Sequence, residues 1–223
     1  MHLTGFEGRI ALVTGAAGGI GAAVVALLRD SGANVIATDL AAPAIDVDHV
    51  HAFALDVTDS AAVDALVARV EADIGPIDLA AHVAGVLSTT TVTGTSDAEW
   101  RRAFAVNTDG VFHVGRALAR VMAPRRRGAL VVVGSNAAGI PRHAMAAYAA
   151  SKAAATMFVR CLGLELAPHG VRCNVVAPGS TRTPMQTGMW ADDQGEARVI
   201  AGTLGNFKSG IPRGKIAEPG DVA

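Results

Sequence analysis

IALVTGAAGGIGAAVV, residues 10–25, carries the signals that specify the fold class. An apolar run with strand character enters a glycine-rich turn, and the turn enters an apolar segment of helical composition. Strand, turn and helix in this order are the context in which a glycine fingerprint binds a dinucleotide. Gly15 permits the tight turn, Gly19 lets backbone amides approach a pyrophosphate, and Gly21 lets the helix pack closely on the strand. The spacing is GxxxGxG rather than GxGxxG, and a glycine-rich loop without a ligand is the alternative interpretation.

The rest of the chain alternates short apolar runs with longer segments of helical period. Strands are predicted at residues 10–13, 34–38, 51–55, 77–82, 129–133 and 171–176. Helices are predicted at residues 19–31, 60–74, 107–122 and 147–167, the second with Asp59 or Ser60 as its N-cap. This alternation is typical of an α/β fold, here a single doubly wound Rossmann-type parallel sheet flanked by helices.

No repeat, linker or break in composition divides the 223 residues. A chain of this length suits one α/β domain, so residues 1–223 are predicted to form a single dinucleotide-binding catalytic domain. Residues 180–215 carry Gly, Pro, Thr and Met without a clear period, and a loop of that length is usually functional. We therefore expect a substrate loop at about residues 180–215.

Composition and charge exclude several classes of function. The formal net charge of −1, with 17% charged residues, argues against a nucleic-acid-binding protein. Cys161 and Cys173 form no CxxC pair, and the seven histidines show no metal-ligand spacing, so no metal is expected and a cytoplasmic location fits. Residues 10–28 lack charge, but their clustered glycines argue against a signal sequence or membrane span.

Two acidic residues follow predicted strands. Asp39 lies eighteen residues beyond Gly21, close to the spacing of a carboxylate that binds the adenosine ribose. An anion there repels the 2′-phosphate of NADP, and neither Arg nor Lys occurs in the turn or just after Asp39, so the predicted cofactor is NAD. Asp56 could bind the adenine amino group, although an Asp at a strand end is often only a cap or turn former.

The chemistry is predicted to centre on Tyr148, the single tyrosine of the chain. Lys152 stands four residues later on a predicted helix, so both side chains emerge from one face. A nearby ammonium favours the phenolate and lowers the pKa of a phenol. Ser135 follows a predicted strand, on the sheet edge where such folds bind ligands. Taken alone, the Tyr–Lys pair could equally be a solvated surface pair.

These motifs in order resemble the short-chain dehydrogenase/reductase family over nearly the whole chain: TGAAGGIG, HVAG at residues 82–85, Asn107, Ser135 and YAASK at residues 148–152. The resemblance implies Tyr148 as the acid/base and Lys152 as the ligand of the nicotinamide ribose that lowers the tyrosine pKa. It also implies that Ser135 orients the substrate and that Asn107 holds a water for proton relay. The cofactor-binding residues it implies are Thr14, Gly15, Ala17, Gly19, Ile20, Gly21, Asp39, Leu40, Asp56, Val57, Ala84, Gly85, Tyr148, Lys152, Pro178, Gly179, Thr181 and Thr183.

The chain departs from the family pattern in two places. His82 stands where the family commonly has Asn, which puts the bracing of the sheet there in doubt. The family members resembled here continue through a further helix and strand, whereas this sequence ends at residue 223, where that helix is expected to begin. The sheet is therefore expected to lack its usual last helix and strand.

Further stretches, among them PRHAMAAY at residues 141–148 and FKSGIPRGK at residues 207–215, resemble the family members that oxidise a ring hydroxyl of a cyclohexadiene carboxylate to give a catechol precursor of siderophores. A small anionic cyclic substrate needs a cation, for which Arg142 is the candidate and Arg182 a less favoured one. Met145 and Gln186 are predicted substrate contacts, with Met185 and Trp190 as further candidates. Arg142 as a solvated loop residue, and the others as ordinary loop packing, are the alternatives.

Three functions compete at this point. The first is an NAD-dependent dehydrogenase of a cyclic dihydrodiol. The second is another activity of the same family, such as 3-oxoacyl reduction or oxidation of a different cyclic alcohol. The third is a nucleotide-binding module without turnover, against which the intact set of Asn107, Ser135, Tyr148 and Lys152 argues. The resemblance also implies a homo-oligomer, typically a tetramer, and neither a nucleic-acid nor a membrane partner is predicted.

Overall fold

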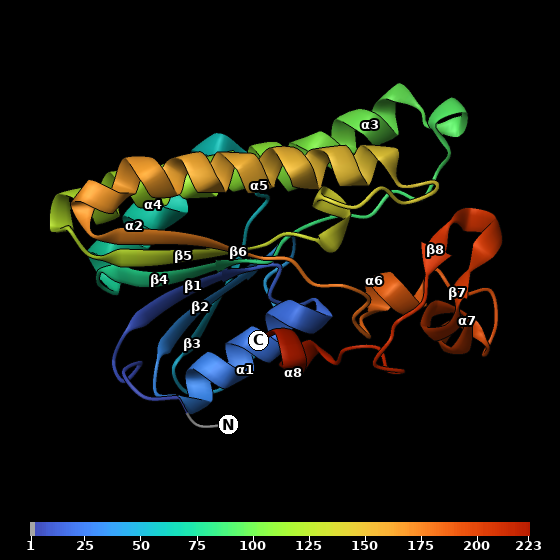
Figure 1. Cartoon of the computed structure of the whole chain (residues 1–223). Helices are drawn as coiled ribbons and strands as arrows, with labels where there is room; N and C mark the ends of the chain where they lie inside the picture. Colours follow the sequence, from blue (N-terminus) through green and yellow to red (C-terminus); the bar gives the residue numbers. More distant parts are fainter. Residues whose placement is uncertain (1–2) are drawn as a thin grey trace.

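The structure is a computed structural model that describes residues 3–223. Six strands form one parallel sheet in the order β3-β2-β1-β4-β5-β6 (Figure 1). The strands are β1 (Ile10–Thr14), β2 (Asn34–Asp39), β3 (Val50–Ala54), β4 (Ile77–His82), β5 (Gly128–Val133) and β6 (Val171–Val176). The order reverses between β1 and β4, and a dinucleotide binds at such a switch point in doubly wound folds. The predicted α/β fold class is confirmed, and no strand boundary differs from the prediction by more than one residue.

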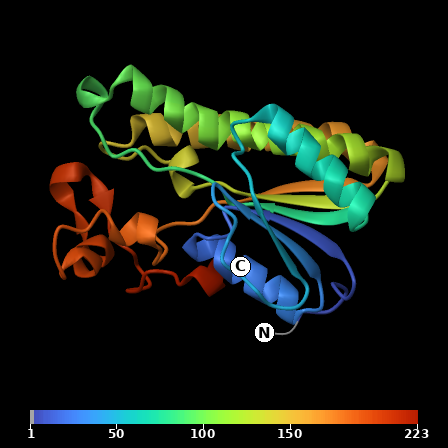
Figure 2. The same cartoon turned by 180° about the vertical axis from the view of Figure 1, so that it is seen from behind.

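Helices cover both faces of the sheet. The long helices are α1 (Gly19–Asp30), α2 (Ser60–Asp73), α3 (Asp97–Phe104), α4 (Gly110–Arg125) and α5 (Ala146–Leu166). Figures 1 and 2 show α2, α4 and α5 on one face, and α1 with the short α8 (Pro219–Val222) on the other. Single 3-10 turns are η1 (Val92–Gly94), η3 (Asn136–Ala138), η4 (Ala167–His169) and η5 (Leu204–Asn206). The result is a three-layer arrangement with two apolar cores.

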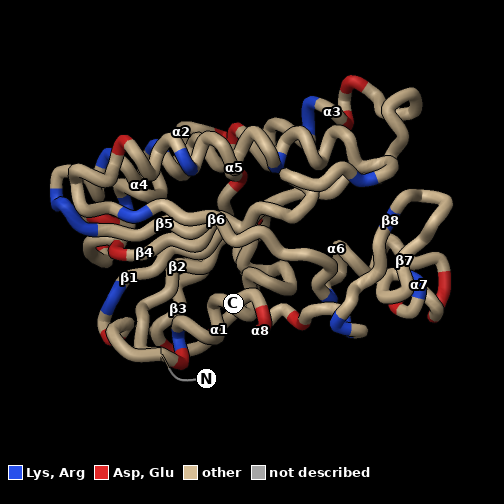
Figure 3. Tube along the Cα trace, in the orientation of Figure 1, with Lys and Arg blue, Asp and Glu red and all other residues tan. Residues whose placement is uncertain are grey.

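The alternation of side chains along β1 separates these two cores. Ile10 and Leu12 belong to the cluster beneath α2, α4 and α5, whereas Ala11 and Val13 belong to the cluster that includes Val25 of α1. Successive side chains of a strand point to opposite faces, so one buried strand supplies both layers. Figure 3 shows the middle of the sheet as almost uncharged, with basic and acidic residues interspersed over the helices and loops.

The helix predicted from residue 107 begins earlier than expected. Ser96 caps α3 through a capping box with Glu99, and α3 then runs through a π-helical segment, η2 (Ala105–Asp109), into α4. The expected start at residue 107 is therefore wrong, because the polar first turns of α3 lack the apolar period on which that prediction rested. The π-helical segment carries Asn107, which is completely buried. Such segments occur often at functional sites.

The expected loop at residues 180–215 contains short elements. They are α6 (Pro184–Thr187), α7 (Gly195–Ala201) and the hairpin of β7 (Gly202–Thr203) with β8 (Lys208–Ser209). Figure 1 shows this part, in orange and red, beside the carboxyl ends of the strands and below the amino-terminal end of α5. We call residues 180–217 the substrate segment. Among residues 3–223, no helix combines the length and the hydropathy that crossing a bilayer requires.

Candidate active site

A cavity of about 1140 Å³ opens at the carboxyl ends of the central strands. Residues that follow β1, β4, β5 and β6 line one wall, and the substrate segment lines another. Ligands of open α/β sheets bind outside the carboxyl ends of the strands, and a cavity of this size can hold a dinucleotide with a small substrate. The position and size of the cavity therefore match the site predicted from the glycine turn.

The glycine turn has no room for side chains at two positions. Gly15 adopts a φ of +68°, and a Cβ there would lie 2.6 Å from the backbone nitrogen of Ala84. A Cβ on Gly21 would lie 2.0 Å from the carbonyl oxygen of Gly15. These contacts draw the turn, the start of α1 and the residues after β4 together at one end of the cavity.

No side chain caps the amino terminus of α1. Gly18 is the N-cap and provides no side-chain hydrogen bond, and the first turn carries no acidic residue. The first amides of a helix lack intrahelical partners, and together with the helix dipole they attract anions. Because Gly19, Ile20 and Gly21 line the cavity here, these residues fit the pyrophosphate of a dinucleotide.

Asp39 and Asp56 both line the cavity near this turn. Asp39 accepts hydrogen bonds from the backbone amides of Ala17 at 3.0 Å and Leu40 at 2.8 Å, one on each oxygen. Each oxygen therefore keeps a lone pair for a sugar hydroxyl. Asp56 accepts from the Thr58 amide at 2.9 Å and the Thr58 hydroxyl at 2.8 Å, both on Oδ1. Asp56 thus forms a turn as well as lining the cavity.

Tyr148 and Lys152 lie on successive turns of α5 and both line the cavity. Burial raises the pKa of the Tyr148 phenol, and a hydrogen bond with the Ser135 side chain opposes that rise. The expectation that Lys152 lowers the pKa of Tyr148 is not met in this structure. Lys152 instead donates from Nζ to the carbonyl oxygen of Val133 at 2.9 Å.

Lys152 is itself strongly affected by its surroundings. Its side chain is almost fully buried, and burial lowers the pKa of its ammonium group to about 8. At pH 7 the group is therefore mostly charged, and it can donate to polar atoms in the cavity. A buried, cavity-lining lysine with a perturbed pKa, one helical turn from a half-buried phenol, is typical of a catalytic site.

Asn107 does not line the cavity but braces its wall. Its Nδ2 donates to the Val86 carbonyl at 2.9 Å and to Ser151 Oγ at 3.0 Å, while Oδ1 accepts from the Val86 amide at 2.9 Å. Ser151 in turn donates to the carbonyl oxygen of Tyr148 at 2.8 Å. Both amide hydrogens of Asn107 are therefore used within the protein, and its side chain ties the loop after β4 to the start of α5.

His82 closes the other side of this loop. The buried Nδ1 of His82 lies 3.1 Å from Thr14 Oγ1, which also accepts from the amides of Val83 at 3.2 Å and Ala84 at 3.3 Å. Burial and the positive charge of Lys152 lower the pKa of His82 to about 3, so the ring is neutral at physiological pH. Despite the departure from the family pattern, His82 and Thr14 hold the ends of β1 and β4 together.

Most of the predicted site residues meet around the cavity. Those that line it are Gly15, Gly19, Ile20, Gly21, Asp39, Leu40, Asp56, Val57, Ala84, Gly85, Ser135, Arg142, Met145, Tyr148, Lys152, Pro178, Gly179, Thr181, Thr183 and Gln186. Thr14, Ala17 and Asn107 do not line it: Thr14 and Asn107 are buried behind its wall, and Ala17 is exposed beside the turn. Of the further candidates, Met185 lines the cavity and Trp190 does not.

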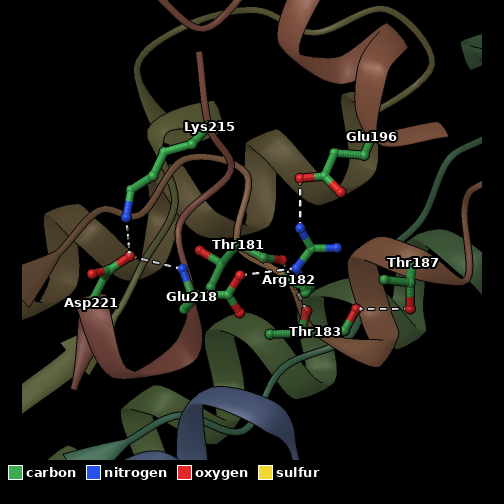
Figure 4. Close-up of polar contacts among 8 residues, drawn as sticks. All are labelled: Thr181, Arg182, Thr183, Thr187, Glu196, Lys215, Glu218 and Asp221. Carbon is green, nitrogen blue, oxygen red and sulfur yellow. Dashed lines mark hydrogen bonds and ion pairs between the residues drawn. The ribbon is translucent and has the colours of Figure 1, made fainter. Parts of the chain in front are cut away.

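Arg182 is engaged elsewhere and does not line the cavity. Its Nη2 donates to Glu196 of α7 at 2.5 Å, and its Nε donates to Glu218 before α8 at 2.9 Å (Figure 4). Its backbone amide also donates to the carbonyl oxygen of Ala217 at 2.8 Å. Arg182 is thus not a carboxylate ligand of the substrate in this structure, and we call its contacts with Glu196 and Glu218 the Arg182 clasp.

Two further residues belong to the site that sequence reasoning did not single out. Lys208 of β8 lines the cavity, although it is far from Tyr148 in sequence. Ser151 is completely buried and links Asn107 to the backbone of Tyr148. For Ser151 the local signal was its place in the YAASK motif, whereas no local pattern distinguishes Lys208 from a surface lysine.

Comparison with known proteins agrees with this geometry. The profile of the short chain dehydrogenase family matches residues 9–194. The chain belongs to the short chain dehydrogenase family. Membership brings with it a nicotinamide dinucleotide as the class of cofactor, and the open amino terminus of α1 and the crowded glycine turn fit such a group.

Known proteins similar to this chain cover nine-tenths of it or more. The 2,3-dihydro-2,3-dihydroxybenzoate dehydrogenase of Bacillus subtilis is 50% identical over 100% of this chain and 89% of its own length. The 3-oxoacyl-acyl-carrier-protein reductase of Escherichia coli is 36% identical over 90% of this chain and 85% of its own. A solved structure of the Thermoplasma acidophilum aldohexose dehydrogenase, 26% identical, superimposes with a TM-score of 0.86 over 97% of this chain and 84% of that one.

Proposed function

We propose that this chain oxidises 2,3-dihydro-2,3-dihydroxybenzoate to 2,3-dihydroxybenzoate, with NAD as the cofactor. One observation carries the choice of substrate: half of all residues are identical, over the full chain, with a relative of that name. Relatives with a different activity are less similar. The cavity supports the chemistry, since it brings a phenol, a hydroxyl and an ammonium together at the carboxyl edge of the sheet.

The proposed mechanism uses three side chains of this cavity. The Tyr148 phenolate accepts the proton of the substrate hydroxyl and becomes a phenol. The Ser135 hydroxyl lies beside Tyr148, where it donates its hydrogen bond to the phenolate before the proton moves and to the substrate oxygen afterwards. Lys152 Nζ holds the ribose hydroxyls next to the reacting carbon. When bound, the nicotinamide supplies the acceptor for the hydride that leaves this carbon. The oxidised ring then tautomerises to the aromatic catechol, which draws the reaction forward.

Arg142, Met145 and Gln186 are the proposed substrate contacts. All three line the cavity, Arg142 and Met145 from the loop before α5 and Gln186 from α6. Arg142 provides the planar cation that suits a carboxylate, and Met145 provides adaptable apolar contact for the ring. Ser135 completes this set at the hydroxyl that reacts.

The experiment that tests the function follows NADH formation and the fluorescence of the catechol product from the dihydrodiol and NAD. A 3-oxoacyl thioester with NADPH and a simple cyclohexanol with NAD serve as alternative substrates. We expect turnover of the dihydrodiol to exceed that of either alternative by orders of magnitude. Turnover of an alternative but not of the dihydrodiol would assign another activity, and firm NAD binding without any turnover would indicate a binding module.

Tyr148→Phe tests the acid/base role in the same assay. The phenylalanine ring fills the same space but cannot accept a proton, so activity should fall by a factor of about 100 or more while NAD binding, measured by calorimetry, stays within a few-fold. Wild-type-like turnover in this variant would remove Tyr148 from its proposed role.

Asp39→Asn tests the choice of NAD over NADP. The neutral amide keeps the size of the side chain but no longer repels a 2′-phosphate, so the preference for NAD in kcat/KM should fall roughly tenfold. Asp56→Asn is the matched control, because it should weaken both cofactors to the same extent. An unchanged preference in Asp39→Asn would contradict the ribose contact.

A further inference from the structure

The cavity is unevenly charged along its length. Among the described residues that line it, the acidic ones are Asp39, the last residue of β2, and Asp56, two residues after β3, at the end near the glycine turn. At the other end, Arg142 comes from the loop before α5 and Lys208 comes from β8 of the substrate segment. The part of the cavity beyond Tyr148 is therefore positive.

Arg142 and Lys208 are partly buried and have no counter-ion among the described residues, whereas Arg102, which also lines the cavity without an ion pair, is exposed. Lys215 also lines the cavity, but its Nζ lies 3.4 Å from Asp221, and Arg182 is held by the clasp (Figure 4). Within residues 3–223, no hydrogen bond or ion pair joins the side chain of Arg142 or Lys208 to another residue. Both side chains are partly buried, so water compensates their charges incompletely.

The two cations are close enough to affect each other. Burial and, secondarily, the positive charge of Arg142 lower the pKa of Lys208. Two like charges that share a partly buried cavity repel each other, and the attraction of both to an anion between them offsets this repulsion.

The backbone beside each cation is strained. Ala144, two residues after Arg142, has a φ of +56°, and Phe207, directly before Lys208, has a φ of +51°. Residues other than glycine rarely adopt this left-handed region, and such strain concentrates at ligand-binding sites. The chain thus keeps both cations at the cavity at some cost in backbone energy.

We propose that Lys208 is a specificity-determining residue, which together with Arg142 binds the carboxylate of a cyclic carboxylate substrate. This inference rests on the proposed function and adds a second cation to its substrate site. The guanidinium can donate two parallel hydrogen bonds to the carboxylate, and the ammonium can donate a third from the opposite wall. Because Lys208 lies on the β7–β8 hairpin, the bound carboxylate also links the substrate segment to the loop before α5.

The test measures binding rather than turnover. 2,3-Dihydroxybenzoate and catechol, which differ by the carboxylate alone, are titrated by calorimetry into the protein saturated with NAD. We expect the wild type to bind the acid more tightly than catechol, and Lys208→Met to lose roughly tenfold in affinity for the acid with little change for catechol. Lys208→Arg should retain most of the preference. Lys215→Met, from the same cavity but paired with Asp221, is the matched control and should bind both compounds as the wild type does.

Three outcomes would overturn the proposal: an unchanged affinity of Lys208→Met for the acid, an equal loss for the acid and for catechol, or a wild type that does not prefer the acid. The proposed function is decided separately, by whether the wild type oxidises the dihydrodiol. If the wild type prefers the acid through Lys208 but does not oxidise the dihydrodiol, the proposal for the cation pair stands and the proposed function is wrong.

Discussion

At the scale of single residues, His82 makes a structural contact in the core, and its burial there keeps the imidazole ring uncharged. The ring is 1% exposed, and its Nε2 has no hydrogen-bond partner among the described residues. Its pKa is lowered to about 3, first by burial and then by the charge of Lys152. The folded protein therefore holds His82 neutral, whereas the unfolded chain binds a proton there below about pH 6.5.

This difference makes the free energy of unfolding sensitive to acid. Between pH 6.5 and pH 3 the unfolded state binds more protons than the folded state, so stability falls as the pH falls, by about 1.4 kcal/mol per pH unit. From pH 7.5 to pH 5.0, His82 should contribute a loss of about 2 kcal/mol, and His82→Asn should remove that contribution.

Urea unfolding at the two pH values measures this contribution. His51→Asn, which removes an exposed imidazole from the edge strand β3, is the matched control and should lose stability in acid as the wild type does. An equal loss in the wild type and in His82→Asn would contradict the assignment of the acid sensitivity to His82.

At the scale of elements, the substrate segment is held in place by few contacts. Its short elements α6, α7, β7 and β8 lie apart from the sheet (Figure 1), and the Arg182 clasp ties α7 to the residue before α8. A parallel bridge between Thr181 and Ala217 closes the base of the segment. The clasp therefore holds together two ends of a segment that carries Gln186 and Lys208.

Arg182→Met should loosen this segment without unfolding the sheet. We expect several-fold faster amide hydrogen exchange in α7 and the β7–β8 hairpin, and a raised KM for the dihydrodiol, because the substrate must then order the segment. Exchange in β1 to β6 should not change. Arg198→Met, which breaks an ion pair with Asp192 inside the segment, is the matched control. Wild-type exchange rates throughout Arg182→Met would exclude this role of the clasp.

At the scale of the whole molecule, the outer surface of α4 and α5 retains large apolar side chains. Phe112 is 39% exposed, Met157 56% and Leu164 78%. Phe112 also packs edge-on against Phe158, with ring centroids 5.7 Å apart. Grouped exposed apolar side chains mark protein–protein contacts more often than free surface. They favour α4 and α5 as the surface through which the homo-oligomer implied by the resemblance would form.

Light scattering after size exclusion tests this assembly. We expect a mass of about four times the 22.6 kDa of one chain for the wild type. Met157→Glu should lower the mass, because a charge buried in an apolar contact is costly. Leu204→Glu, at the exposed tip of the substrate segment, should leave it unchanged. A monomeric wild type would rule out the proposed assembly.

Local sequence signals predict the sheet and the cofactor end of the site. Residues 10–25 are enough to predict β1, the glycine turn and the start of α1. The signals are strand composition, turn glycines and helical period, and all of them act between near neighbours in the chain. The same holds for Tyr148 and Lys152, which stand four residues apart on one helix and therefore share one face. The prediction of a single domain over residues 1–223 stays a prediction.

Which distant groups face each other depends on how the whole chain packs. In the folded chain Arg182 pairs with Glu196 and Glu218, and Asn107 donates both amide hydrogens to Val86 and Ser151. Burial raises the pKa of Tyr148, where a lower pKa was expected. The tertiary structure also places Lys208 on the cavity that Arg142 lines. Each result depends on burial and on contacts across tens of residues, which no local pattern encodes, because burial is a property of the packed chain and not of the segment.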